Sequence, residues 1–90
     1  MTERRRVQIV NIKGLHARAS AKLVEVVEAH DATAKVSKDG MQAGGDSIMG
    51  LLMLAASKGT FIEVETLGSQ EIALADAIVA LVADKFGEGD

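Results

Sequence analysis

Apolar and polar residues alternate with a period of two along four short segments, which indicates four β-strands. The segments are residues 6–11, 33–37, 41–43 and 60–67. In the second segment Ala34 and Val36 share one face, and in the fourth Ile62, Val64 and Thr66 do so. Each strand is therefore expected to bury one side and expose the other.

Three further segments carry apolar residues at helical spacing, residues 17–29, 48–56 and 70–86. In the first of these helices we expect a core-facing set made of Ala17, Ala21, Leu23, Val24 and Val27. In the last, the apolar stripe consists of Leu74, Ala75, Ile78, Leu81 and Val82. Both helices are thus predicted to pack one face against a core.

Turn and cap signals separate these segments. Residues 11–14 interrupt the first strand as a loop, and Asp39-Gly40 is typical of a tight hairpin. Residues 44–47 form a second loop that ends in Ser47, a favoured helix N-cap residue. From Gly87 onward the chain is predicted to be an acidic, frayed tail.

The resulting element order is βαββαβα, with four strands and three helices in 90 residues. Such an order predicts an α+β fold, in which helices cover one face of a mainly antiparallel sheet. The length fits one domain spanning residues 1–90.

Composition narrows the functional classes. The chain has no cysteine, which excludes disulfides, thiolate metal ligands and a thiol nucleophile, and which is compatible with a reducing cytoplasm. A net charge of −3 and only two aromatic residues argue against nucleic-acid binding, and the run Arg4 to Arg6 is interpreted as a solvated strand start. With no signal-peptide pattern and no apolar run long enough for a bilayer, we expect a soluble cytoplasmic protein without membrane insertion.

Two histidines are the candidate chemical groups. His30 lies in a polar connection beside Glu28 and Asp31, so we expect an ordinary surface residue. His16 lies where a loop becomes a helix, and it is either a capping or surface histidine or a functional one. Because the unpaired N–H groups and the dipole of a helix start favour anions, a phosphoryl group on His16 would be stabilised there.

Neighbouring residues fit a phosphate-accepting site. Arg18 can add a charge-assisted contact to phosphate oxygens, and neutral imidazole is a competent nucleophile near neutral pH. Gly14 is expected to leave room for the backbone of a partner. No nucleotide-binding loop is present, so the phosphoryl donor must be another molecule.

Other chemistries fail on residue content. His16 has no second histidine or cysteine at ligand spacing, so neither a metal nor a cofactor is expected. Ser20 and Ser47 are the candidate hydroxyl nucleophiles, but neither lies in a strained nucleophile elbow or has an acid partner for a catalytic triad.

The helix predicted at residues 48–56 is apolar on nearly all sides. Either the helix faces the core entirely, or Leu51 and Leu54 face the core while Ile48, Met49 and Leu52 form a docking surface. Phosphate on Ser47 at its start would be compatible with the helix and would place about two negative charges beside that surface.

Gly14-Leu15-His16-Ala17-Arg18 resembles the phosphorylation motif of HPr, the histidine-containing phosphocarrier of the bacterial phosphotransferase system. Asp46-Ser47-Ile48-Met49-Gly50-Leu51 resembles the regulatory-serine motif of the same family. Both motifs, their spacing and the element order fit, so the resemblance covers essentially the whole chain. It implies an open-faced β-sandwich with three helices on one side.

The resemblance also implies roles. His16 would take phosphate on its δ1 nitrogen from enzyme I, itself charged from phosphoenolpyruvate, and pass it to an enzyme IIA domain. Arg18 would contact the phosphate, and Ser47 would be modified by HPr kinase/phosphorylase. Ile48, Met49 and Leu52 would lie on the shared docking helix. The chain would then be a phosphoryl carrier with a phosphohistidine intermediate rather than a stand-alone enzyme, and we expect a monomer.

One departure from the family pattern is informative. Many members have proline after the motif arginine, whereas this chain has Ala19-Ser20. This variant resembles members of the nitrogen-related branch, which implies regulation of nitrogen or carbon metabolism more than sugar uptake. The competing hypothesis is an interaction module of the same fold that binds regulatory partners without phosphoryl transfer, but relatives of that kind lack the histidine.

Overall fold

The computed structural model describes residues 2–88, and within them the chain forms the strands and helices in the expected order. The strands are β1 (Glu3–Gln8), β2 (Thr33–Lys38), β3 (Met41–Gly44) and β4 (Phe61–Leu67). The helices are α1 (Ala17–Glu28), α2 (Ile48–Met53) and α3 (Glu71–Ala83), and a short 3-10 turn, Lys85–Gly87, follows α3.

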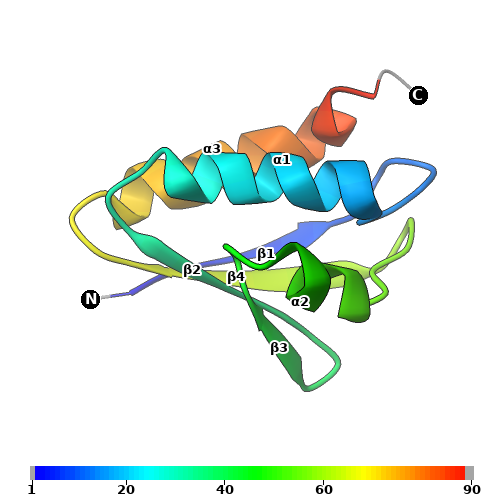
Figure 1. Ribbon diagram of the computed structural model, residues 1–90, viewed down its shortest axis with the longest axis horizontal. Coiled ribbons are helices and arrows are strands. Elements are labelled where there is room, and N and C mark those ends of the chain that lie inside the picture. Colours follow the sequence, from blue (N-terminus) through cyan, green and yellow to red (C-terminus); the bar gives the residue numbers. More distant parts are fainter. Residues whose placement is uncertain (1, 89–90) are drawn as a thin grey trace.

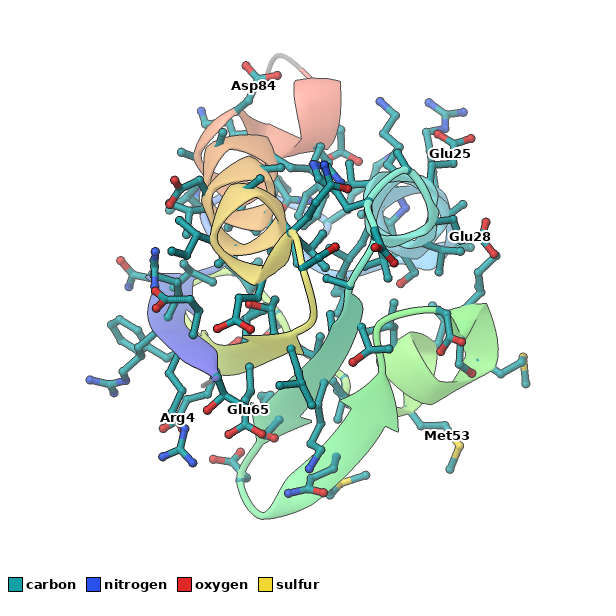
Figure 2. All side chains as sticks on the ribbon, turned by 90° about the vertical axis from the view of Figure 1, so that its left-hand side faces the viewer. Arg4, Glu25, Glu28, Met53, Glu65 and Asp84 are labelled. Atoms are coloured by element: carbon teal, nitrogen blue, oxygen red, sulfur yellow. The ribbon has the colours of Figure 1, made fainter. Side chains whose placement is uncertain are left out.

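The four strands form one antiparallel sheet in the order β1-β4-β2-β3. In Figure 1, α1 and α3 lie side by side over one face of the sheet, and α2 lies next to β3. Within the described residues, the other face has no helix over it, and Figure 2 shows Arg4 and Glu65 on that side. This arrangement confirms the predicted α+β open-faced sandwich.

The core lies between the sheet and the helices. On the strands, the predicted inward-facing residues Ala34, Val36, Ile62, Val64 and Thr66 are all buried. On α3, the predicted stripe is confirmed at Leu74, Ala75, Ile78 and Val82, while Leu81 is half-buried.

Helix α1 buries the predicted Leu23, Val24 and Val27, but not the two predicted alanines. Ala17 is exposed and Ala21 is half-buried, so placing both in the core was wrong. The buried residues are Ala19, Ser20, Leu23, Val24 and Val27. The large apolar side chains of Leu23 and Val24 determine which face of the helix is buried. Ala19 and Ser20 are buried as well, because they lie one turn earlier on the same face.

Strand β1 runs from Glu3 to Gln8, so it contains the arginine run that was interpreted as its start, and it ends before residue 11, where the alternating pattern was expected to end. The arginine run extends the strand because each outward-facing arginine has a partner on β4. Arg4 Nε lies 2.8 Å from Glu65 Oε2, and the guanidinium carbon of Arg6 lies 4.1 Å from the centre of the Phe61 ring. Opposite charges and cation–π pairs across neighbouring strands stabilise such pairing.

Helices α2 and α3 are shorter than predicted. Helix α2 ends at Met53 rather than residue 56, because Ala55 adopts a left-handed conformation with φ of 51°. Helix α3 ends at Ala83 rather than residue 86, because Lys85 and Phe86 also have positive φ values and enter the 3-10 turn. This turn buries Phe86 and carries the chain back toward α1, where the Lys22 ammonium donates to the carbonyl of Phe86 at 2.6 Å.

Candidate functional site

His16 is the N-cap residue of α1, with extended backbone angles (φ −78°, ψ −175°). Its Nδ1 atom accepts a hydrogen bond from the backbone N–H of Arg18 at 3.2 Å. About a quarter of the side chain is exposed, 26 %. One ring nitrogen therefore lies at the electropositive start of a helix, within reach of a partner molecule.

The loop before His16 is fixed by contacts with the segment that follows α2. The N–H of Leu15 donates to the carbonyl of Ala56 at 2.8 Å. Gly14 has φ of +66°, and a Cβ at this position would lie 2.4 Å from the Ala56 oxygen. Gly14 is buried against the chain's own residues 56–57, so the expectation that it leaves room for a partner's backbone was wrong.

The other ring nitrogen of His16 contacts Glu88, which follows the 3-10 turn after α3. Nε2 is hydrogen-bonded to the Glu88 carboxylate, whose Oε1 accepts a hydrogen bond from Asn11 Nδ2 at 2.8 Å. Asn11 is fully buried and also donates to the Gly14 carbonyl at 2.8 Å. The frayed tail predicted from Gly87 onward was therefore wrong at Glu88, while residues 89–90 lie outside the described part of the chain.

Positive charge gathers around the exposed edge of the His16 ring. An open hollow of about 610 Å³ includes His16 and is lined by Ile12, Lys13, Ala17, Arg18, Lys22, Gly87 and Glu88. Arg18 and Lys13 are exposed, and Lys22 is half-buried. The hollow thus combines three cations with one carboxylate, which favours an anionic group next to the ring.

His30 lies at the opposite end of α1. It is half-buried, and its Nδ1 is hydrogen-bonded to the carbonyl oxygen of Val26 at 2.8 Å. The ring caps the last turn of the helix, where unpaired carbonyl groups take up donors. His30 is therefore half-buried and hydrogen-bonded to the helix, and differs in this from the ordinary surface histidine that was expected.

Ser47 is the N-cap of α2, as expected for its position. Its Oγ accepts a hydrogen bond from the N–H of Gly50 at 3.0 Å, and its carbonyl accepts one from the N–H of Leu51 at 3.0 Å. The side chain is half-buried at the edge of the helix. The hydroxyl therefore has a structural function as a cap, independent of any modification.

Helix α2 carries an exposed apolar patch, here called the α2 patch, made of Ile48, Met49 and Met53. Their exposed fractions are 40 %, 70 % and 68 %. Leu51 is buried as expected, and Leu52 is half-buried rather than exposed. Met53 was not among the predicted surface residues, and Figure 2 shows its side chain directed away from the body of the protein.

The His16 hollow and the α2 patch lie on adjoining elements. Helix α2 packs against α1, and the backbone hydrogen bond from Leu15 to Ala56 joins the loops next to them. Ile12, in the loop before His16, is also 65 % exposed. A partner that reaches the His16 ring therefore has exposed apolar side chains nearby to contact.

Two kinds of feature are absent from residues 2–88. No three histidine, aspartate or glutamate side chains gather closely enough to hold a metal ion. No helix in this range combines the length and the apolar character needed to cross a membrane.

Comparison with known proteins identifies similar chains. Residues 3–84 match the family model described as PTS HPr component phosphorylation site. The chain is 46% identical over 82 residues to the phosphocarrier protein HPr of Cupriavidus necator, covering 91% of this chain and 92% of that protein. It is 40% identical over 89 residues to the phosphocarrier protein NPr of Escherichia coli K12, covering 98% and 99%. The crystal structure of HPr-C-His from Thermoanaerobacter tengcongensis superposes with a TM-score of 0.91 at 32% identity, covering 96% and 97%.

Proposed function

The chain belongs to the HPr family of phosphocarriers, and from this premise we propose that His16 is the residue that carries the phosphoryl group. The observation that supports this assignment is the placement of Nδ1 at the start of α1, beside the N–H of Arg18. His30 has its Nδ1 engaged with a backbone carbonyl at the other end of the helix. Of these two rings, His16 alone lies in the cationic hollow.

In this proposal, the lone pair of His16 Nδ1 attacks the phosphorus atom of a phosphorylated donor protein. The bond between phosphorus and the donor's leaving atom breaks, and its electron pair returns to the donor. Arg18, Lys13 and Lys22 line the hollow and stabilise the phosphoryl oxygens through charge. The reverse sequence of bond changes passes the group to the next protein.

The family resemblance supports enzyme I as the donor, charged from phosphoenolpyruvate, and an enzyme IIA domain as the acceptor. Both would meet the same surface, because one phosphorylated ring has to be reached in turn by each of them. The α2 patch, on the helix that packs against α1, would supply the apolar contact area, with Met49 and Met53 able to adapt to two different partners. Leu52, being half-buried, would contribute less than predicted.

Regulation by HPr kinase/phosphorylase at Ser47 is the second part of the proposal. Ser47 begins the helix that carries the α2 patch, so a phosphate there would lie at the rim of the docking surface. The resemblance at Ala19-Ser20 favours a regulatory role in nitrogen or carbon metabolism over sugar uptake, in the cytoplasm where these partners would act.

The test is labelling by phosphoenolpyruvate and purified enzyme I, read as the gain of one acid-labile phosphate by mass spectrometry. His16→Ala loses the cap contact with the Arg18 N–H and the hydrogen bond to Glu88, which should cost about 1–2 kcal/mol of unfolding free energy but leave the protein folded, and it should take up no phosphate. His30→Ala is the matched control and should label like the wild type. Full labelling of His16→Ala, with loss of labelling in His30→Ala, would overturn the assignment; a wild-type protein that takes up no phosphate would favour the interaction module.

A further inference from the structure

Asn11, Glu88 and His16 form a continuous chain of hydrogen bonds that begins in the core and ends at the reactive ring. We propose that Glu88 is a positioning residue, which holds His16 in the tautomer with its proton on Nε2 and stabilises the charge that phosphorylation creates on the ring. This inference rests on the proposed function of His16 as phosphoryl acceptor.

Two hydrogen bonds on opposite sides of the ring favour the same tautomer. An ionised carboxylate can only accept, so the Nε2 atom that contacts Glu88 carries a hydrogen. The backbone N–H of Arg18 can only donate, so the Nδ1 atom that it contacts carries a lone pair. The nitrogen with the lone pair is the nucleophile, and it is the one at the start of α1.

Asn11 holds the Glu88 carboxylate in place. Its Nδ2 group donates both to Glu88 Oε1 and to the Gly14 carbonyl, each at 2.8 Å, and because both partners are acceptors the amide orientation is fixed. The Asn11 side chain is completely buried, and its Oδ1 has no hydrogen-bond partner among residues 2–88. Since an unpaired buried oxygen destabilises a fold, the residue is best explained by its two donated hydrogen bonds.

Phosphorylation makes the carboxylate more important. When the Nδ1 lone pair forms the bond to phosphorus and the donor keeps the electron pair of the broken bond, the proton stays on Nε2 and the ring becomes a cation. The other charged side chains in the hollow are Lys13, Arg18 and Lys22, all of which oppose that charge. Glu88 is the acidic side chain in contact with Nε2, so it keeps the proton there.

A phosphorylated ring that keeps its Nε2 proton is the better leaving group, because it departs as a neutral imidazole. Glu88 is therefore expected to speed both onward transfer and spontaneous hydrolysis of the phosphorylated protein. The difference in rate that Glu88 makes should be largest in mildly alkaline solution, where a phosphorylated ring without a carboxylate partner gives its Nε2 proton to water.

The experiment compares the wild-type protein with Glu88→Gln and Glu88→Asp, and uses Glu28→Gln as a matched control. Glu28 is exposed near the far end of α1, and Figure 2 shows it on the outer side of that helix. The first measurement is the tautomer of His16 in the unphosphorylated protein, from ¹⁵N chemical shifts at about pH 8, where an imidazole is neutral. The second is the hydrolysis rate of the phosphorylated protein as a function of pH.

We expect the Nε2–H tautomer in the wild type and in Glu28→Gln, and a mixture of tautomers in Glu88→Gln. Hydrolysis of phosphorylated Glu88→Gln at about pH 8 should be about threefold to tenfold slower, with its pH profile shifted to lower pH. Glu88→Asp retains the charge on a shorter side chain, so its rate should lie between those of the wild type and Glu88→Gln.

Unchanged ¹⁵N shifts together with an unchanged hydrolysis profile in Glu88→Gln would overturn the positioning role. So would an equal change in Glu28→Gln, because that would trace the effect to net charge alone. Failure of the wild-type protein to label at His16 would instead overturn the proposed function, and the tautomer measurement would then decide the positioning role by itself.

Discussion

Replacing Gly14 with alanine tests how the loop before His16 is held. Gly14 has φ of +66°, a conformation that side chains rarely adopt. Its carbonyl accepts hydrogen bonds from Asn11 Nδ2 at 2.8 Å and from the N–H of His16 at 2.9 Å. A shift of this residue would therefore disturb both sides of the candidate site.

The magnitude follows from three contributions. Left-handed backbone costs an alanine about 1–2 kcal/mol. The new Cβ would lie 2.4 Å from the Ala56 oxygen and 2.9 Å from the Ser57 Cα, and because both are backbone atoms the segment must move, at about 1 kcal/mol or more. Moving it weakens the 2.8 Å hydrogen bond from Leu15 to Ala56, worth about 1 kcal/mol. We expect Gly14→Ala to lose about 3–4 kcal/mol of unfolding free energy.

The assay is urea unfolding followed by circular dichroism, with Gly40→Ala as the matched control. Gly40 also has positive φ, +82°, but nothing lies within 4 Å of an added Cβ. Its substitution should cost only the backbone contribution, about 1–2 kcal/mol. Equal losses of unfolding free energy in the two variants would refute the close-packing argument for Gly14. In addition, the folded fraction of Gly14→Ala should take up phosphate more slowly than the wild type.

Three further changes give separable outcomes. Arg18→Ala should slow phosphoryl transfer about tenfold, because a guanidinium in the hollow is lost. The unfolding free energy should change by less than about 0.5 kcal/mol, because Arg18 is exposed. An unchanged transfer rate would show that the backbone N–H groups are sufficient to stabilise the phosphoryl group. Ser47→Asp should keep the helical circular dichroism signal, because aspartate is also a good N-cap residue. Its rate of labelling by enzyme I should be about tenfold lower than that of Ser47→Ala. Equal labelling rates in the two variants would contradict the regulatory hypothesis. Ala55→Gly should raise unfolding free energy by about 0.5–1 kcal/mol in urea titration, because φ of 51° strains an alanine; a loss of stability would contradict that account.

The sheet and its inward face could be predicted because β-strands repeat every two residues. Ile62, Val64 and Thr66 alternate with Phe61, Glu63 and Glu65, and each of the three is buried. Periodicity gave the wrong result at Ala17 and Ala21. A small side chain gains little free energy from burial, so an alanine does not indicate which side of a helix faces the core. Periodicity also failed at Ala55, since no sequence signal marks an alanine that adopts left-handed backbone and ends a helix.

The candidate site was predictable only in its local part. His16 and Arg18 are two positions apart in the sequence and lie at a helix start that the loop signal predicts. Asn11 and Glu88 are 77 positions apart, and their hydrogen bond depends on the 3-10 turn that brings Glu88 back toward α1. A contact between residues so far apart in the sequence produces no periodic pattern. Glu88 was therefore interpreted as part of a solvated tail.

The most direct test of the central claim is the identity of the phosphorylated atom. The wild-type protein would be labelled with ¹⁵N, incubated with phosphoenolpyruvate and enzyme I, and examined by ³¹P and ¹⁵N NMR. The account predicts one phosphoryl group per chain, coupled to Nδ1 of His16, the nitrogen that accepts from the N–H of Arg18. Phosphate on Nε2 of His16, on His30, or on no histidine at all would contradict it.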